Sequence, residues 1–221
     1  MKAFYWAFLL IFTASSLANT IDTDLQELEK TLGSYPPAIE NEAQQKEITK
    51  KYELLKKKLD SLLKSDPKNE SALYQRGLLQ TFGHNMDHPD SWRGADEDLK
   101  NVLRLNPSNV RAILDLANLY VNSDPTLAPA AEILYKSAQC FLDPAPDEEA
   151  QRGLFFAYYY QGKVPLAYKQ ALILKNSWPE NGYDKLIDMT ASVLKRNNEI
   201  TPNYQADKLV HTSCEKPDST T

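Results

Sequence analysis

The chain has 221 residues, of which 42% are hydrophobic and 25% charged, with 7 glycines, 13 prolines and a formal net charge of −5. The apolar share excludes a wholly disordered chain, and the glycine and proline counts exclude a collagen-like fibre. The acidic balance argues against nucleic acid as the main partner, because binding phosphates requires clustered Lys and Arg. Scarce glycine favours helices that are joined by turns of Pro, Asn and Asp.

Residues 1–18 predict a secretory signal peptide. Lys2 precedes the apolar stretch Ala3–Ala14, and the small residues Ser16 and Ala18 stand three places and one place before an expected cut after Ala18. An uncleaved anchor is the alternative, but the apolar stretch is shorter than the ~20 residues of a typical span. Loss of Lys2 would change the formal net charge from −5 to −6. We expect the mature chain to be secreted or periplasmic, with no membrane span.

An oxidising compartment affects the interpretation of the two cysteines. Cys140 and Cys214 form either a disulfide that ties the C-terminal tail to the body of the protein or two unpaired thiols. Their separation fits no Cys-x-x-Cys motif, and both alternatives stay open.

Four segments share one spacing: an apolar or small residue, a second four positions later, a third after three more, and then a proline. They are Leu55–Pro67, Ala95–Pro107, Ala131–Pro144 and Ala167–Pro179. Steps of four and three place these side chains on one helical face, and the proline ends the helix. Another helical pattern follows each of the first three prolines, over Leu73–Leu78, Ile113–Tyr120 and Leu154–Tyr158. The chain is therefore predicted to be a string of helix pairs.

Capping helices are predicted at both ends of this string. Residues 39–65 predict a long charged helix with an apolar stripe that covers the first pair: Ile48, Tyr52, Leu55, Leu59 and Leu62. Its lysines alternate with acids, so we expect i,i+4 ion pairs on a solvated face. Residues 182–194 predict the other cap. The expected domains are an N-terminal segment over residues 19–38, a repeat domain over 39–195 and a polar tail over 196–221.

This organisation resembles the tetratricopeptide repeat (TPR) family, whose helix-turn-helix unit of ~34 residues has small residues at the helix contact and a terminal proline. The segment Val110–Pro144 matches best, through Ile113, Leu116, Ala117, Tyr120, Ala131, Tyr135 and Ala138. The resemblance covers about residues 48–194. It implies an all-α fold of antiparallel helix-turn-helix repeats, stacked as a short right-handed superhelix. The chain departs from the family pattern at Arg76, where the family has Leu, and in an inserted loop over Gly83–Trp92.

The resemblance also implies a concave partner-binding groove lined by the first helix of each pair. In one register the matching residues are Arg111, Leu114, Asn118, Asn122, Arg152, Phe156, Tyr159 and Tyr160. The aromatic run from Phe155 to Tyr160 cannot all face one core stripe of a helix. Tyr and Arg suit a binding surface because each combines apolar area with a polar tip. Packing of these aromatic residues between neighbouring repeats is the alternative.

Catalytic signals are weak. The sequence has no His-Glu-x-x-His, no Gly-x-Ser-x-Gly and no glycine-rich phosphate loop. Residues 84–90 place two histidines near two aspartates, which is a composition that suits a divalent metal, and the alternative is a plain inserted loop.

The sequence therefore predicts a non-catalytic scaffold, without metal or cofactor, that binds a protein or an extended peptide outside the cytoplasm. One alternative is an envelope maturation or assembly factor that presents unfolded clients to a membrane enzyme, as some TPR proteins do in cytochrome c biogenesis. The other alternative is a metal-dependent hydrolytic protein that uses residues 84–90.

Overall fold

The computed structural model describes residues 20–199 together with residues 202, 204 and 211. The predicted signal peptide and Cys214 lie outside the described residues. Within these residues the secondary structure is helical and contains no strand, which confirms the all-α class. The chain divides into two compact units, Met1–Pro107 (unit 1) and Ser108–Thr221 (unit 2), and this division falls inside the predicted repeat domain. Each unit is described by itself.

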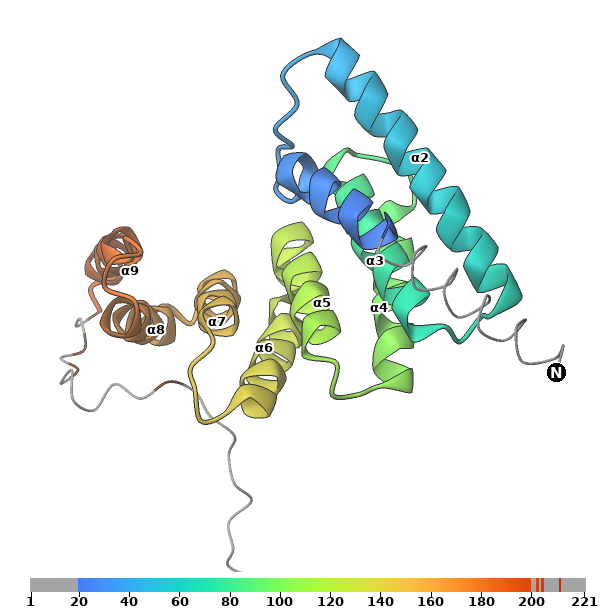
Figure 1. The fold of residues 1–221 in the computed structure, drawn as a ribbon. Coiled ribbons are helices and arrows are strands. Elements are labelled where there is room, and N and C mark those ends of the chain that lie inside the picture. Colours follow the sequence, from blue (N-terminus) through green and yellow to red (C-terminus); the bar gives the residue numbers. More distant parts are fainter. Residues whose placement is uncertain (1–19, 200–201, 203, 205–210, 212–221) are drawn as a thin grey trace, which may run out of the picture. The chain divides into compact units, whose positions relative to one another are not determined.

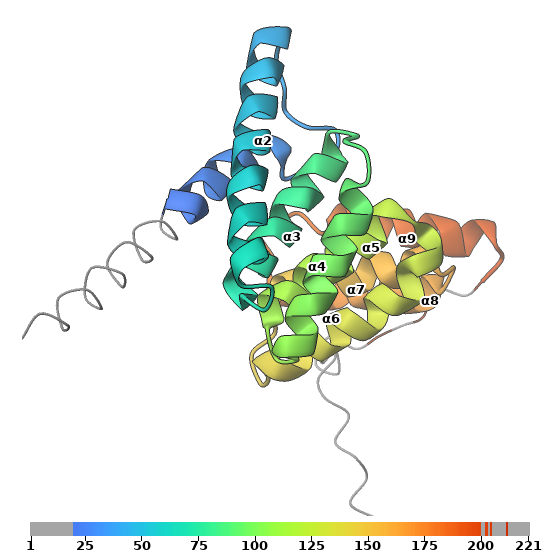
Figure 2. The same ribbon diagram turned by 90° about the vertical axis from the view of Figure 1, so that its right-hand side faces the viewer.

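Unit 1 contains a helix over residues 20–32 and three longer helices. These are α2 (Glu42–Ser65), α3 (Glu70–Asn85) and α4 (Ser91–Leu105), drawn from blue to green in Figure 1. Helix α3 packs against both α2 and α4, and Figure 2 shows α3 and α4 side by side. Residues 20–32, which were expected only as an N-terminal segment, bury one apolar face: Ile21, Leu25, Leu28 and Leu32.

Helix α2 begins three residues later than the sequence predicted. Asn41 caps it, and its side chain accepts a hydrogen bond from the backbone N–H of Gln44 at 2.9 Å. The interior face consists of Ile48, Tyr52, Leu55, Leu59 and Leu63. The predicted stripe was therefore wrong at its last position, because Leu62 is half-buried and Leu63 packs inside.

The inserted loop of unit 1 is shorter than predicted. Helix α3 continues through Gly83 and His84 to Asn85, so the connection to α4 spans only residues 86–90. Gly83 serves close packing here, since a Cβ atom on it would lie 2.5 Å from the Tyr52 hydroxyl oxygen. The turn is made instead by Asp87 and Asp90, which have φ angles of 57° and 59°.

Arg76, the departure from the TPR pattern, lies in a partly buried ion network between α2, α3 and α4. Its Nε donates to Asp98 Oδ2 at 2.7 Å, its Nη2 to Asp98 Oδ1 at 2.8 Å and its Nη1 to Asp60 Oδ1 at 2.9 Å. Gln80 Nε2 also donates to Asp98, at 2.7 Å. Because Asp98 is only 2% exposed, this carboxylate depends on Arg76 for its charge partner.

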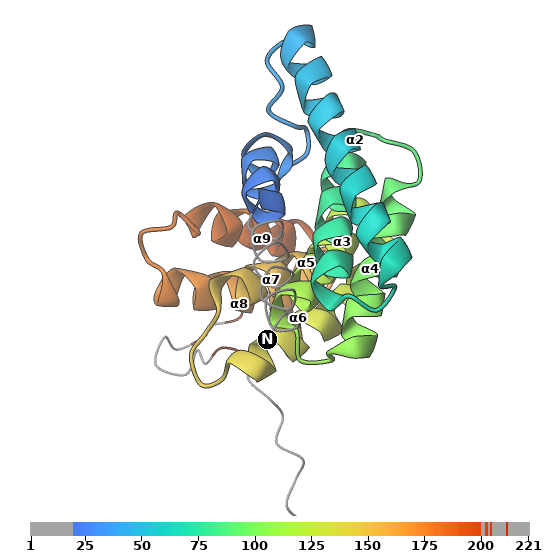
Figure 3. The ribbon, with the colours of Figure 1, turned by 45° about the vertical axis from the view of Figure 1, so that its right-hand side comes forward.

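Unit 2 is a chain of helices in which each packs against the next (Figure 3). They are α5 (Val110–Ser123), the short 3₁₀ helix η1 (Pro125–Leu127), α6 (Ala128–Leu142), α7 (Glu148–Tyr160), α8 (Val164–Ser177) and α9 (Asp184–Arg196). Asn109 and Asp147 cap α5 and α7 by accepting the N–H of the residue three positions later. The predicted terminal helix over 182–194 is α9, displaced by two residues.

Glycine and glutamine explain how α6, α7 and α8 approach one another. A Cβ atom on Gly153 would lie 2.1 Å from ring carbons of Tyr135, so α7 requires glycine where it crosses α6. Gln151 donates to Gln139 Oε1 at 2.8 Å and accepts from Gln170 Nε2 at 2.6 Å. All three glutamines are buried, and their hydrogen bonds to one another satisfy polar groups in the core.

Candidate partner-binding surface

The aromatic run of α7 divides between the core and the surface, as its spacing predicted. Phe155 and Tyr158 are buried, Phe156 and Tyr159 are half-buried, and Tyr160 is 44% exposed. A helix turns by 3.6 residues, so a run of neighbouring side chains must point to several sides of it. Helix α7 therefore presents aromatic surface on the side that its core residues leave open.

The outer tyrosine rings of α7 stack on phenylalanine rings of the preceding turn. Tyr159 stacks on the buried Phe155 with 6.1 Å between ring centroids, and Tyr160 stacks on Phe156 at 6.3 Å. Tyr159 and Tyr160 also meet edge to face at 6.0 Å. These distances are within the range of favourable aromatic pairs. We call Phe156, Tyr159 and Tyr160 the α7 aromatic patch.

Arg152, one to two turns before the patch, is exposed beside an acidic group at the start of α7. Glu148 accepts a hydrogen bond from Asn181 Nδ2 at 2.6 Å and another from the Tyr183 hydroxyl. These bonds, together with the charge of Arg152, lower the pKa of Glu148. Burial, and then the bond to Glu148, raise the pKa of Tyr183 to about 12. The first turn of α7 is thus tied to the residues that lead into α9.

The α5 residues implied by the TPR resemblance have unlike environments. Leu114 is only 4% exposed and offers almost no surface to a partner. Asn118 is half-buried and joins three helices, because its Oδ1 accepts from the Tyr135 hydroxyl at 2.6 Å and its Nδ2 donates to Glu149 Oε1 at 2.6 Å. Arg111 and Asn122 are exposed.

Helix α5 packs against α7 within unit 2, and the hydrogen bond from Asn118 to Glu149 joins the two helices. Glu148, Asn181 and Tyr183 were not predicted as parts of this surface. The acids at the start of α7 look from sequence like ordinary stabilisers of a helix N-terminus. Their partners lie 33 and 35 positions later in the chain, beyond the reach of any local pattern.

The proposed metal or hydrolytic loop is divided between two elements. His84 belongs to α3, whereas His88 lies in the connection, with its Nε2 3.0 Å from Glu53 Oε1 and its Nδ1 3.3 Å from Ser91 Oγ. In a hydrolase triad the serine bonds Nε2 of the histidine and the acid bonds Nδ1, whereas here the two ring nitrogens are exchanged. Ser91 is only 3% exposed, and the contact of His88 with Glu53 joins the connection to α2. In the described part of the chain, no group of three or more His, Cys, Asp or Glu is arranged to hold a metal.

Cys140 is disulfide-bonded at the end of α6. The proposed partner Cys214 lies outside the described residues, and the pairing stays a prediction. The described tail residues lie against other parts of unit 2: His211 Nε2 is 3.6 Å from Asp143 Oδ1, and the Tyr204 ring is 6.4 Å from that of Tyr168.

Within the described residues, no helix combines the length and the apolar character that crossing a membrane requires. Comparison of the chain with protein-family models, with curated proteins and with solved structures found no match.

Proposed function

We propose that unit 2 is a TPR-like repeat domain that binds a protein segment or extended peptide along α5 and α7, outside the cytoplasm and without catalysis. The observation that carries this proposal is the α7 aromatic patch. Aromatic rings that are partly open to solvent and backed by buried rings are typical anchors of protein interfaces.

Contacts between the rings hold the patch in place before a partner binds. Stacking of Tyr159 on Phe155 and of Tyr160 on Phe156 restricts the rings, so little side-chain entropy is lost on binding. The tyrosine hydroxyls and the guanidinium of Arg152 offer hydrogen bonds around the apolar area. An extended segment with an apolar side chain and a nearby carboxylate or backbone carbonyl suits this surface.

Partner capture tests the proposal. Residues 19–221 serve as bait on an extract from the native source, and the dissociation constant of the captured partner is then measured with purified components. The triple variant R152A/Y159A/Y160A should weaken binding by at least about 100-fold, because each hot-spot residue contributes roughly 2 kcal/mol. Circular dichroism checks that helical content is unchanged.

A matched control removes exposed apolar area from another helix of the same unit. Ile133 and Phe141 on α6 are strongly exposed, and the variant I133A/F141A should keep the affinity of the unmodified chain. If R152A/Y159A/Y160A binds as tightly as this control, the α7 aromatic patch is not the binding surface.

A further inference from the structure

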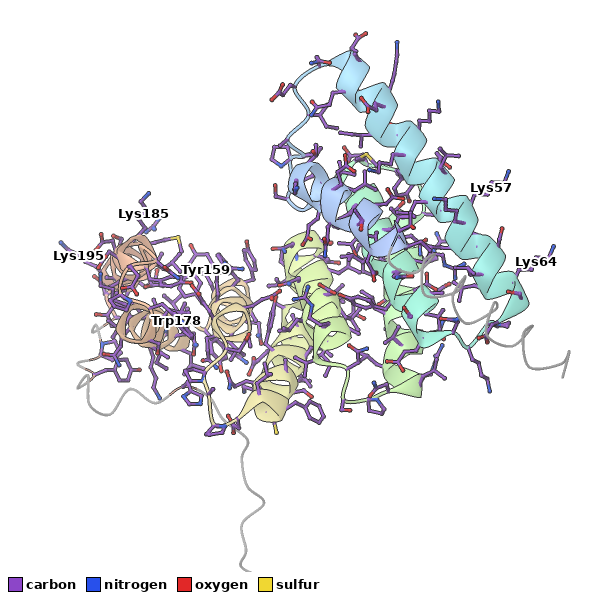
Figure 4. The ribbon with its side chains drawn as sticks, viewed as in Figure 1. Lys57, Lys64, Tyr159, Trp178, Lys185 and Lys195 are labelled. Carbon is purple, nitrogen blue, oxygen red and sulfur yellow. The ribbon has the colours of Figure 1, made fainter. Side chains whose placement is uncertain are left out.

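One face of α2 carries an uninterrupted row of exposed residues that we call the basic stripe: Lys50, Leu54, Lys57, Ser61 and Lys64. Steps of four and three keep these residues on one side of the helix, opposite its buried face. The stripe spans 14 residue steps, or about 21 Å at the rise of an α-helix. In Figure 4, Lys57 and Lys64 extend from the same side of α2, away from α3.

The other lysines of this part of α2 have acidic partners. Lys51 Nζ lies 3.4 Å from Asp24 Oδ1 and also contacts Glu27, and Lys58 Nζ lies 3.7 Å from Asp24 Oδ2. Lys56 pairs with Asp60 at 2.8 Å, as the predicted i,i+4 pairing requires. Among the described residues, the lysines of the basic stripe make no such contact.

The acids that would neutralise the stripe are engaged on other sides of the helix. Glu53 stands four positions before Lys57 and contacts His88 at 3.0 Å. Asp60 stands four positions before Lys64 and accepts from Arg76 at 2.9 Å. Glu47 is exposed and stands three positions before Lys50, the first lysine of the row. Three positive charges therefore remain along one exposed face.

The shape and chemistry of the stripe favour a flat anionic surface as its ligand. Lysine is a compact point charge, whereas recognition of a single carboxylate or phosphate in a fixed geometry favours arginine. The row lies on the exposed face of a single helix, and such a face does not surround a bound peptide. Leu54 is 54% exposed between lysines, and Leu54 and Leu62 line an open pocket with Lys57, Lys58 and Ser61. Clustered lysines are attracted to the headgroups of anionic lipids, and Leu54 adds apolar area between them.

We propose that the basic stripe of α2 binds the surface of an anionic lipid bilayer. The order of the chain supports this surface over an acidic protein. Asp24, whose contacts with Lys51 and Lys58 hold the helix over residues 20–32 beside α2, follows the predicted signal segment by six positions. If this predicted segment enters a membrane, it holds this end of unit 1 at the bilayer until cleavage. This inference concerns unit 1 and is independent of partner binding by unit 2.

Vesicle sedimentation tests the proposal with a chain that lacks residues 1–18 and keeps every described residue. The probes are vesicles of phosphatidylcholine with and without about 30 mol% phosphatidylglycerol, at low and high salt, because screening weakens surface attraction. We expect binding only to the anionic vesicles, and release at high salt. The variant K50Q/K57Q/K64Q should lower the partition coefficient about 100-fold, since each lysine near such a surface contributes roughly fivefold.

A matched control changes the net charge equally at another place. Lys185, Lys195 and Arg196 are exposed on α9, and K185Q/K195Q/R196Q should partition as the unmodified chain does. Equal losses in both triple variants would show that net charge alone is responsible and would overturn the assignment to α2. Absence of binding to the anionic vesicles at low salt, or equal binding to both lipid compositions, would also overturn it. Binding to polyglutamate without binding to vesicles would instead assign the stripe to an acidic protein.

Discussion

Replacing Arg76 by methionine should destabilise unit 1 strongly. The change removes three charge-assisted hydrogen bonds, two of which reach the buried carboxylate of Asp98. Asp98 keeps only the bond from Gln80 and remains almost without solvent. Breaking a buried ion pair on one side costs about 3–5 kcal/mol, mainly because the other charge stays buried without its partner.

Two tryptophans allow the unfolding of each unit to be measured separately. Residues 19–221 contain Trp92 in unit 1 and Trp178 in unit 2, so Trp178→Phe leaves a fluorophore that follows urea unfolding of unit 1 alone. Arg93→Met is the control, because Arg93 and Asp90 form an exposed pair at 2.9 Å and such pairs contribute about 0–1 kcal/mol. The double variant Arg76→Met with Asp98→Leu should recover much of the stability, since neither charge of this pair remains. A loss below about 1 kcal/mol for Arg76→Met, or no recovery in the double variant, would refute the reasoning.

Two further predictions concern unit 2, with Trp178 as the reporter in a Trp92→Phe background. Burial raises the pKa of Glu132, but hydrogen bonds from Lys136, Lys163 and Gln161 outweigh it and bring the pKa to about 2. The ionised form therefore stabilises the fold above its unfolded pKa of about 4.3, and this stability should be lost as pH falls toward 2. Glu132→Gln should make the melting temperature depend less steeply on pH between these values. An unchanged slope of melting temperature against pH would contradict the assignment. Gly153→Ala should cost about 2–3 kcal/mol because its Cβ would meet the Tyr135 ring. Gly162→Ala, at φ +71° with open space around it, should cost about 1 kcal/mol, and equal losses in urea unfolding would contradict the close contact.

Much of the helical structure was predictable because helix faces and helix ends leave local signals. Apolar residues in steps of three and four marked the buried faces, and Asn or Asp marked the first turns of α5 and α7. Residues 20–32 carry the same signal in Ile21, Leu25, Leu28 and Leu32, so this helix was also predictable. The loop was predicted to begin at Gly83, but this glycine lies within α3 and allows close contact with Tyr52.

The surface of α7 was predictable only in part, for a physical reason. The run of aromatic residues shows that some rings must face outward, and Phe156, Tyr159 and Tyr160 do. Which α5 residues share that surface depends on how α5 packs on its neighbours. Leu114 is buried by that packing, and Asn118 is bound to Tyr135 and Glu149.

The charges of α2 show most clearly why local rules do not suffice. The spacing of four residues predicts ion pairs of Glu53 with Lys57 and of Asp60 with Lys64. In the structure Glu53 contacts His88, and Asp60 pairs both with Lys56 on α2 and with Arg76 on α3. Arg76 itself is required by Asp98, which is buried and would otherwise lack a cationic partner. The exposed cation at Lys64 is therefore a consequence of charge pairing inside unit 1, and no rule that counts only neighbours along α2 predicts it.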